Sequence, residues 1–385
     1  MNDEQITRLL QDLVQMASVD PHGDPGTTTQ NTGEARIAEY VADVLRKLAL
    51  DVEVHEVEPG RPNVIGKFSS RGARKVVAFA PHTDTVSVAG MTIDPFAAEI
   101  RDGRLYGRGA CDTKGSLAAM LAGLTNAVRR REFREGDLDV YFCALMGEES
   151  GNDGVRALVK RGFKADFAVA GEPTNCRVVN THKGAITFRI ITRGKSAHSS
   201  VPERGESAIK KMAGVVDTLL GEYADSLRQI HDAVLGSPTT NVGIIRGGSQ
   251  TNIVPDYCEI EIDRRTVPGE NHDEILRHLR DRLSAEVEMI GVCAPLYTDP
   301  QNPFIRALGR QTAGAPWFCD AAIFAEYGIP AVAFGPGDIA QAHTADEFVE
   351  LGEVFHAARI VEEFLLSGCE IPERGDPPLG EREED

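Results

Sequence analysis

Apolar positions recur at two different spacings in the first half of the chain, and the two spacings alternate. Ile6, Leu9, Leu10 and Leu13 follow the spacing of an amphipathic helix, whereas residues 75–82 form a short apolar run typical of a buried strand. The elements predicted up to residue 173 are helix 1–16, helix 33–48, strand 75–82, helix 114–130, strand 137–146 and strand 165–173. Because strands that alternate with helices favour a mostly parallel sheet covered on both faces, this order predicts an α/β domain.

The order of elements changes near residue 182. The next segments are strand 182–194, helix 206–230, strands 240–248 and 257–267, helix 271–283 and strand 287–293. This β-α-β-β-α-β order is typical of a ferredoxin-like α+β unit. The alternation of strands and helices then resumes through residues 302–314, 321–328 and 329–337 and a last helix from about residue 350 to 366.

A chain of 385 residues exceeds the size at which a single hydrophobic core stops growing, which favours two structural units. We therefore predict an α/β domain formed by residues 1–181 and 294–369, with a smaller unit, residues 182–293, inserted into it. Residues 370–385 are rich in acids and prolines and have almost nothing to bury, so they are expected to form an acidic disordered tail.

Charge and composition exclude several classes of partner. The formal net charge of -18 would repel nucleic acid and anionic lipid, and no apolar run approaches the length of a membrane span. The seven cysteines are scattered, odd in number and form no C-x-x-C pair, which is typical of free thiols in a reducing compartment. We expect a cytoplasmic protein that binds neither nucleic acid nor membranes.

Acids and histidines follow the predicted strands of the α/β domain at five places. They are His82 and Asp84 in "APHTDTV", Asp112 in "GRGACDTKG", Glu148 and Glu149 in "MGEESG", Glu172 in "GEPT", and His343 in "AHTADEF". Loops after parallel strands meet at one edge of the sheet, so these residues are expected to converge. Any one of them alone would more commonly be a helix cap or a surface residue, but five together favour a shared site.

Clustered carboxylates repel one another unless a cation compensates, so the five motifs together predict a metal site. Imidazole and carboxylate ligands without thiolate suit zinc or cobalt in a hydrolytic site. If Asp112, Glu149 and Glu172 bind two divalent ions together with neutral His82 and His343, three negative ligands meet four positive charges. The remaining charge of +1 suits a bridging hydroxide.

Glu148 and Glu149 are adjacent, and successive side chains of a strand point to opposite faces. Both can serve one site only if the strand has already ended, which the flanking glycines permit. Glu149 would then bind a metal, while Glu148 would act as the general base that takes a proton from the attacking water.

These motifs, with "SAHSSVPERG" between them, resemble in content and order the family of dinuclear zinc hydrolases that includes acetylornithine deacetylase, succinyl-diaminopimelate desuccinylase, aminoacylase and carboxypeptidase. The resemblance covers nearly the whole chain apart from the acidic tail. It implies that His82 and Glu172 bind one zinc ion, that Glu149 and His343 bind the other, and that Asp112 bridges them. It also implies that Asp84 orients His82 and that the Asp112–Thr113 peptide bond is cis.

The inserted unit resembles the lid or dimerisation domain of the same family, which implies a homodimer. His198 matches a histidine that reaches the scissile carbonyl oxygen in relatives, often from the partner subunit. Asn252 and Arg265 match positions that hold the substrate's carboxylate, with Arg264 as the neighbouring candidate. A solvated loop histidine and an exposed strand arginine are the structural alternatives for these residues.

The leading hypothesis is an enzyme, a two-zinc or two-cobalt amidohydrolase that cleaves an N-acyl amino acid such as N-acetylornithine. A metallo-exopeptidase, a dipeptidase or carboxypeptidase with the same site, is the alternative, and a succinyl-diaminopimelate desuccinylase is a third candidate. A non-catalytic protein that retains the fold would be expected to lack the base or a ligand, and this chain has all of them.

Overall fold

The computed structural model describes residues 1–22, 30–71, 73–136 and 138–367, and these form two compact units. The first unit comprises Met1–Asn180, Thr298–Ala313 and the described residues from Cys319 onward. The inserted unit comprises Thr181–Tyr297 and Gly314–Phe318. The expected acidic tail, 370–385, lies outside the described residues.

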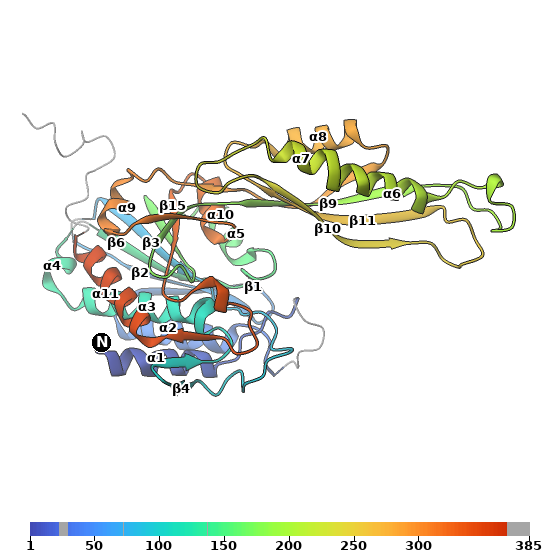
Figure 1. Ribbon diagram of the computed structural model, residues 1–385. Helices are drawn as coiled ribbons and strands as arrows, with labels where there is room; N and C mark the ends of the chain where they lie inside the picture. The colour runs from blue at the N-terminus through green and yellow to red at the C-terminus, as the bar shows by residue number, and fades with distance from the viewer. Residues whose placement is uncertain (23–29, 72, 137, 368–385) are drawn as a thin grey trace, which may run out of the picture. The chain divides into compact units, whose positions relative to one another are not determined.

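A twisted sheet forms the centre of the first unit (Figure 1). Its strand order is β1-β2-β6-β3-β7-β15-β8, and β13 (Leu296–Tyr297) pairs with the end of β8. The strands are β1 (Asp51–Glu58), β2 (Arg61–Phe68), β3 (Lys75–Pro81), β6 (Leu138–Ala144), β7 (Phe167–Gly171), β8 (Val178–His182) and β15 (Ala331–Phe334). Strands β6, β3, β7 and β15 run parallel, and their side chains are almost all buried. The predicted α/β fold class with a mostly parallel sheet is confirmed.

The outer strands β1 and β2 form an antiparallel hairpin that the sequence analysis did not predict. Side chains of β1 are exposed or only partly buried along its whole length, because it is the edge strand of the sheet. Its sequence, DVEVHEVE, therefore lacks the continuous apolar run by which the central strands were found.

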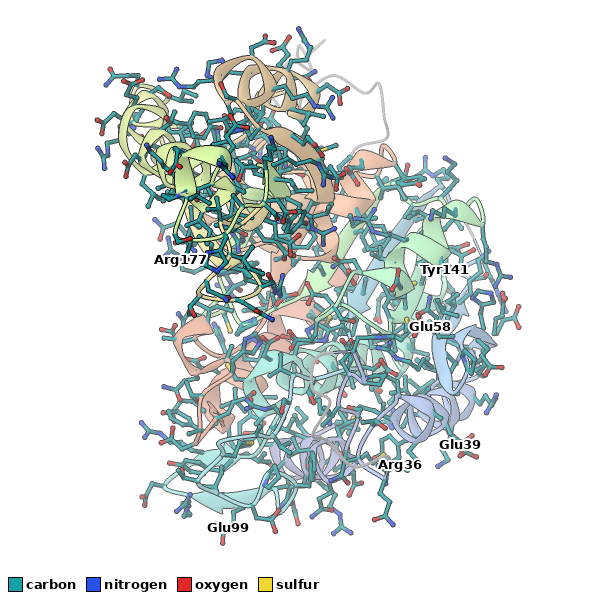
Figure 2. The ribbon with its side chains drawn as sticks, turned by 90° about the vertical axis from the view of Figure 1, so that its right-hand side faces the viewer. Arg36, Glu39, Glu58, Glu99, Tyr141 and Arg177 are labelled. Atoms are coloured by element: carbon teal, nitrogen blue, oxygen red, sulfur yellow. The ribbon has the colours of Figure 1, made fainter. Side chains whose placement is uncertain are left out.

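Helices cover both faces of this sheet. The helices of the first unit are α1 (Asp3–Gln15), α2 (Ala35–Lys47), α3 (Gly115–Val128), α4 (Arg131–Arg134), α5 (Asp153–Lys160), α9 (Pro303–Leu308), α10 (Asp320–Glu326) and α11 (Leu351–Ser367). One face is covered by α1, α2, α3 and α11, and the other by α5 and α10 (Figure 1). The outward side of α2 carries Arg36 and Glu39, both exposed (Figure 2).

Local sequence signals explain where these helices begin. Asn2 caps α1 by accepting a hydrogen bond from the backbone N–H of Gln5, whose side chain in turn accepts from the backbone N–H of Asn2. Helix α3 is mostly apolar on all sides, and nearly every residue in it is buried, because it lies between the sheet and α11.

A three-stranded sheet of β4 (Glu99–Arg101), β5 (Arg104–Tyr106) and β16 (Phe348–Glu350) adjoins this region.

The inserted unit is a four-stranded antiparallel sheet in the order β10-β11-β9-β12, packed against helices. Its elements are β9 (Gly184–Arg193), α6 (Ala208–Thr218), α7 (Ala224–Leu227), β10 (Thr239–Gly247), β11 (Tyr257–Thr266), α8 (His272–Arg282), β12 (Glu286–Cys293) and β13 (Leu296–Tyr297). Along the chain these elements follow the order β9, α6, β10, β11, α8 and β12, apart from the short α7 after α6. This is the β-α-β-β-α-β order of the ferredoxin-like arrangement.

The structure divides one predicted helix and defines the elements of residues 302–314, to which the sequence assigned no type. The single helix expected over 206–230 is α6 and α7 separated by a π-helical turn at Leu219–Tyr223, where Gly221 has a non-helical backbone. Residues 302–314 contain the short helix α9, which ends at Gly309 with a positive φ, and then strand β14 (Thr312–Ala315). Glycine interrupts the helical pattern in both cases.

Within the described residues, no helix combines the length and the apolar character needed to cross a membrane.

The close packing of α3 on α11 depends on Gly123. A Cβ atom at this position would lie 2.6 Å from Val361 Cγ1 and 2.8 Å from the carbonyl oxygen of Ala358. Gly123→Ala should therefore lower the free energy of unfolding by about 1–3 kcal/mol through overpacking, measured by urea denaturation. The matched control is Gly352→Ala in α11, where a Cβ meets no atom within 4 Å. The control should be neutral or stabilising by about 0.5–1 kcal/mol, and equal effects of both substitutions would contradict the packing account.

Candidate metal centre

The candidate site residues of the first unit lie where its parallel strands end. His82 directly follows β3, Glu172 directly follows β7, and Glu148 and Glu149 follow β6 after a short turn. Because β6, β3 and β7 are parallel neighbours, these carboxyl ends meet at the same edge of the sheet. The structure therefore brings together residues that are distant in sequence.

Asp112 and His343 come from loops with unusual backbones. Asp112 lies in a tight turn ahead of α3, and the Asp112–Thr113 peptide bond is cis, as the family resemblance implied. His343 follows β15 and a short 3-10 turn, and it has a positive φ of 63°. A positive φ is uncommon for a residue with a side chain and is often found at functional sites.

Asp112 lies between the two imidazoles. Its Oδ1 is 3.2 Å from Nε2 of His82, and its Oδ2 is 3.3 Å from Nε2 of His343. The same His343 Nε2 is 3.3 Å from Oε2 of Glu149. Each carboxylate oxygen of Asp112 thus contacts a different histidine.

Potential metal-ligand atoms come close together in two groups of three side chains. One group is His82, Asp112 and Glu149, and the other is His82, Glu148 and Glu172; within each, the ligand atoms lie within 4.8 Å of one another. Asp112 and Glu172 are buried, whereas the side chain of His343 is 52% exposed. The site is therefore closed on the side of the sheet and open at His343.

Burial and mutual repulsion shift the pKa values of these acids upward. Burial raises the pKa of Glu148 and of Glu172 well above the usual range, and neighbouring carboxylates add to both shifts. Burial and the charge of Asp112 raise the pKa of Glu149 to about 7. Carboxylates with such pKa values are costly to keep ionised without a cation between them.

The histidines partly compensate this charge. Burial alone would raise the pKa of Asp112, but its hydrogen bonds with His343 and His82 hold it below the usual value. The same contacts with Asp112 and Glu149 raise the pKa of His343 to about 10. Without a metal, the protonated imidazole of His343 is therefore favoured, because it supplies positive charge next to the carboxylates of Asp112 and Glu149.

The residues fit a divalent metal. Oε1 of Glu149 is buried and has no hydrogen-bond partner among the described residues, although a buried polar atom normally has one. The available donors are imidazole nitrogens and carboxylate oxygens, the set that suits zinc in hydrolytic sites. This unpartnered carboxylate oxygen belongs to the residue that also contacts His343, so it is available as a ligand atom.

Asp84 connects the two strand-end loops. Its Oδ1 accepts a hydrogen bond from the backbone N–H of Glu148 at 3.1 Å, and its Oδ2 accepts from that of Glu149 at 3.0 Å. Nδ1 of His82 lies 3.4 Å from Oδ1 of Asp84 and 3.1 Å from its backbone oxygen. Asp84 is fully buried, so these contacts fix both the ring of His82 and the loop of the paired glutamates.

Strand β6 has ended at Ala144 before the two glutamates begin. Gly147 has a positive φ of 69°, and the chain turns there, so the strand alternation that would separate Glu148 from Glu149 no longer applies. The contact of both backbone N–H groups with Asp84 holds the resulting turn in place.

Two residues around Glu148, Asn152 and Asp320, carry no sequence signal that predicts a role in the site. The Nδ2 group of Asn152 donates to Oδ1 of Asp320 at 2.8 Å and to Oε1 of Glu148 at 3.4 Å. Asn152 and Asp320 are both buried. Asn152 has a positive φ of 59° at the start of α5, and Asp320 opens α10, so each has the sequence context of an ordinary helix-start residue.

A third acidic group, Asp20, Glu34 and Asp84, lies beside the site. Here the chain supplies its own cation, because the buried guanidinium of Arg61 contacts Asp20 at 2.6 Å and Glu34 at 2.7 Å. Its Nη1 also donates to Glu58, at the end of β1 (Figure 2). No local sequence pattern predicts this network, because its members are distant from one another along the chain.

Two of the predicted residues of the inserted unit, His198 and Asn252, lie on its surface. His198 and Ile253 form a β-bridge, and the N–H of Ser199 donates to the carbonyl of Asn252 at 3.0 Å, so His198 and Asn252 belong to adjacent segments. Both are exposed. His198 Nδ1 lies 2.8 Å from the hydroxyl of Ser200.

Arg264 and Arg265 point to opposite faces of β11. Arg264 is 1% exposed, and its guanidinium contacts Glu270 and the hydroxyl of Tyr223. Arg265 is partly exposed and contacts Asp263 at 2.8 Å. The guanidinium of Arg264 is therefore buried in the core of the inserted unit with its own partners, and Arg265 is the more accessible of the two.

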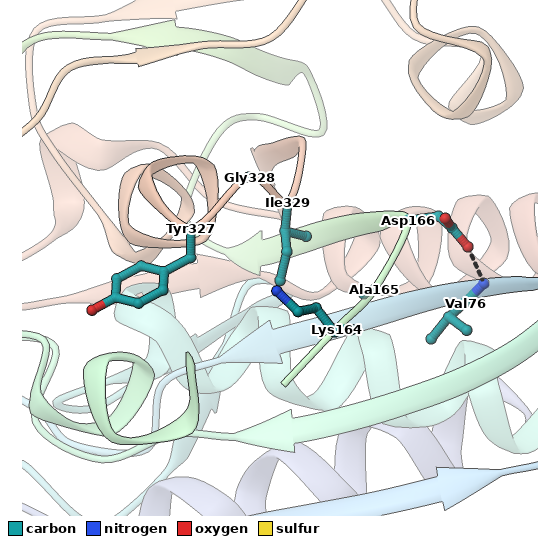
Figure 3. A pocket seen from close by; sticks show the side chains of 7 residues that line it. All are labelled: Val76, Lys164, Ala165, Asp166, Tyr327, Gly328 and Ile329. Atoms are coloured by element: carbon teal, nitrogen blue, oxygen red, sulfur yellow. Dashed lines mark hydrogen bonds between the residues drawn. The ribbon is translucent and has the colours of Figure 1, made fainter. Parts of the chain in front are cut away.

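A separate pocket of about 310 Å³ opens in the first unit (Figure 3). It is lined by Val76, Lys164, Ala165, Asp166, Tyr327, Gly328 and Ile329. Asp166 accepts a hydrogen bond from the N–H of Val76 at 2.9 Å. Val76 is the second residue of β3 and Asp166 precedes β7, so this pocket lies at the amino ends of the strands, opposite the acids and histidines.

The profile of peptidase family M20/M25/M40 matches residues 78–367, three quarters of the chain. The chain belongs to this family. The matched range contains His82, Asp112, Glu149, Glu172 and His343. The protein is therefore a hydrolase of amide bonds, as the sequence predicted, and the resemblance on which that prediction depended is confirmed.

The chain is similar in sequence to acetylornithine deacetylases and similar in structure to a tripeptidase. The acetylornithine deacetylase of Vibrio vulnificus is 30% identical over 374 residues, covering 92% of this chain and 95% of the relative. That of Myxococcus xanthus is 31% identical over 320 residues, covering 79% and 83%. A crystal structure of a tripeptidase from Staphylococcus aureus has a TM-score of 0.76 and 24% identity, covering 96% and 99%, and shares the fold.

The contacts of Asp84 generate a prediction for this site. In Asp84→Asn, the amide group would direct a donor toward one of two backbone N–H groups and release part of the Glu148–Glu149 loop. We expect the affinity for Zn²⁺ to fall by about 10–100-fold, measured by competition with a chromophoric chelator. Asp346→Asn, an exposed acid near His343, is the matched control. Equal affinities of Asp84→Asn and the control would refute the role assigned to Asp84.

Proposed function

We propose that this M20 hydrolase is a metal-dependent deacetylase that cleaves the amide bond of an N-acyl amino acid of the N-acetylornithine type. The proposal depends above all on one observation, the cluster of two imidazoles and four carboxylates at the carboxyl edge of the sheet, in which only His343 is exposed. Similarity to acetylornithine deacetylases over 92% of the chain supports the substrate class.

Two zinc ions would be held by the residues that the sequence analysis named. His82 and Glu172 would bind one ion, Glu149 and His343 the other, and Asp112 would lie between them. The 3.2 and 3.3 Å contacts of the two Asp112 oxygens with separate imidazoles support the bridging position. Cobalt would suit the same donors. When bound, the two ions would lower the pKa of the attacking water and polarise the amide carbonyl.

Glu148 would act as the general base and then as the general acid. Its pKa, which burial and nearby carboxylates raise, suits a group that accepts a proton from water and later delivers it to the leaving amine. Asn152 contacts Oε1 of Glu148 and would hold the carboxyl group in one orientation. Asp84 would orient His82 and keep Glu148 next to the ligands.

Three residues of the inserted unit would bind the substrate. His198 would donate a hydrogen bond to the scissile carbonyl oxygen, from its own subunit or from a partner. Asn252 and Arg265 would hold the substrate's carboxylate, and the exposure of Arg265 favours it over the buried Arg264. We further propose a cytoplasmic homodimer that forms through this unit and binds neither nucleic acid nor membranes, in line with the net charge of -18.

A metallo-exopeptidase is the second candidate, since the same groups would hydrolyse a terminal peptide bond. The structural likeness to a tripeptidase keeps this candidate open. A succinyl-diaminopimelate desuccinylase is a third. All three share the chemistry of the first unit and differ in what binds beyond the reacting amide.

A substrate panel separates the candidates. We expect the zinc-loaded protein to hydrolyse N-acetylornithine with kcat/KM at least tenfold above that for N-succinyl-diaminopimelate and for dipeptides, which corresponds to about 1.4 kcal/mol of transition-state binding. The assay detects the released primary amine. Turnover of dipeptides without turnover of acylated amino acids would establish the exopeptidase instead.

Glu148→Gln tests the general base. The substitution keeps the size of the side chain but removes its ability to accept a proton, so kcat should fall by about 10²–10⁴-fold. The zinc content, measured by elemental analysis after dialysis, should remain that of the wild type. Glu99→Gln, at an exposed position of β4, should leave both values unchanged. Wild-type turnover by Glu148→Gln would remove this residue from the mechanism.

A further inference from the structure

Glu347 is a buried acid to which neither the family motifs nor the proposed mechanism gives a role. It lies four residues after His343 and directly before β16, and it is 0% exposed. An ionised carboxylate is rarely buried without several partners. All the partners of its carboxylate lie on the segment that leads into Asp112.

The carboxylate of Glu347 accepts four hydrogen bonds from that segment. Its Oε2 accepts from Nη1 of Arg108 at 2.7 Å and from the N–H of Gly109 at 3.1 Å. Its Oε1 accepts from the N–H of Cys111 at 2.9 Å and from the N–H of Asp112 at 3.0 Å. Each oxygen therefore has two donors, and one of the four donors is the backbone of the proposed bridging ligand itself.

The local sequence is suited to this contact. Gly109 has a positive φ of 82°, and a Cβ atom there would lie 2.7 Å from Cγ2 of Thr85, so only glycine fits this turn. The turn aims the N–H groups of Gly109, Cys111 and Asp112 at one carboxylate, as in the backbone nests that bind anions. Here the anion is supplied by a side chain of the chain itself.

The backbone strengthens the same connection. The N–H of Gly107 donates to the carbonyl of Glu347 at 3.0 Å, and β16 pairs with β5 next to it. Nε of Arg108 also donates to the carbonyl of Ser87, in the loop that follows His82. The segment around Asp112 is thus held from two sides, by the loop of His343 and by the loop of His82.

We propose that Glu347 is a positioning residue that sets the place of Asp112 relative to His343 and thereby the spacing of the two metal positions. Asp84 acts in the same way on Glu148 and Glu149, so two ligand loops are each held by a buried carboxylate that belongs to another ligand loop. This inference depends on the proposed metal site, and the experiment separates its failure from the failure of that site.

The test uses Glu347→Gln, which replaces one acceptor oxygen by an amide donor that would face two N–H groups. Wild type and variant are freed of metal, titrated with Co²⁺ and followed by visible absorption, because the d–d spectrum reports ligand geometry. We expect the variant to bind Co²⁺ about 10–100-fold more weakly and to show an altered absorption spectrum. We also expect kcat to fall by a larger factor than the factor by which KM changes. The control is Glu350→Gln on β16, whose carboxylate contacts Arg104 at the surface and which should match the wild type.

The outcomes are distinct. A Glu347→Gln protein that is less thermally stable but has the Co²⁺ affinity and spectrum of the wild type would give Glu347 only a structural role and overturn the inference. If Glu347→Gln does not fold, Glu347→Asp, which keeps the charge and shortens the reach, should show the same change in spectrum to a smaller degree; an unchanged spectrum would again overturn it. A wild-type protein that binds no Co²⁺ would refute the proposed metal site itself.

Discussion

The repulsion among buried carboxylates at the carboxyl edge of the sheet is the constraint on which the rest of the first unit depends. Ligand atoms of Asp112 and Glu149 lie within 4.8 Å of each other, as do those of Glu148 and Glu172, and both pairs adjoin His82. Burial raises the pKa of Glu148, Glu149 and Glu172. Keeping several such groups ionised in one place costs several kcal/mol unless positive charge is close by. The fold gathers these groups nonetheless, which is physically reasonable if divalent cations are part of the native protein.

The surrounding contacts show how the chain maintains this arrangement. Asp84 holds the backbone of the paired glutamates, and Glu347 holds the backbone ahead of Asp112. Arg61 forms ion pairs with Asp20 and Glu34 nearby, and Oδ2 of Asp20 accepts a hydrogen bond from Ser150, which directly follows the glutamates. These three buried groups hold loops that parallel strands alone would leave free, and preorganised ligands of this kind favour catalysis.

The sequence was sufficient for the fold class and for the convergence of the acids because both follow from local patterns. Apolar runs located β3, β6 and β7, and the acids and histidines directly after them were visible in the sequence. The edge strand β1 was missed because its side chains are not buried, and Gly221 interrupts a helix that periodicity had extended to residue 230.

The supporting residues could not be found in the same way. Glu347, Asn152 and Asp320 look like ordinary loop and helix-start residues, and their partners lie between 4 and 239 positions away. Only the folded chain brings them together. The accessibility of Arg265 and the burial of Arg264 likewise follow from which face of β11 covers the core, a choice that two adjacent arginines do not reveal.

The central claim is that paired cations compensate the clustered carboxylates, and anomalous diffraction from zinc-soaked crystals tests it most directly. Data collected at the zinc absorption edge should give two peaks per chain. Both should lie beside Asp112, one against His82 and Glu172 and the other against Glu149 and His343. A single peak, or peaks remote from Asp112, would contradict the account.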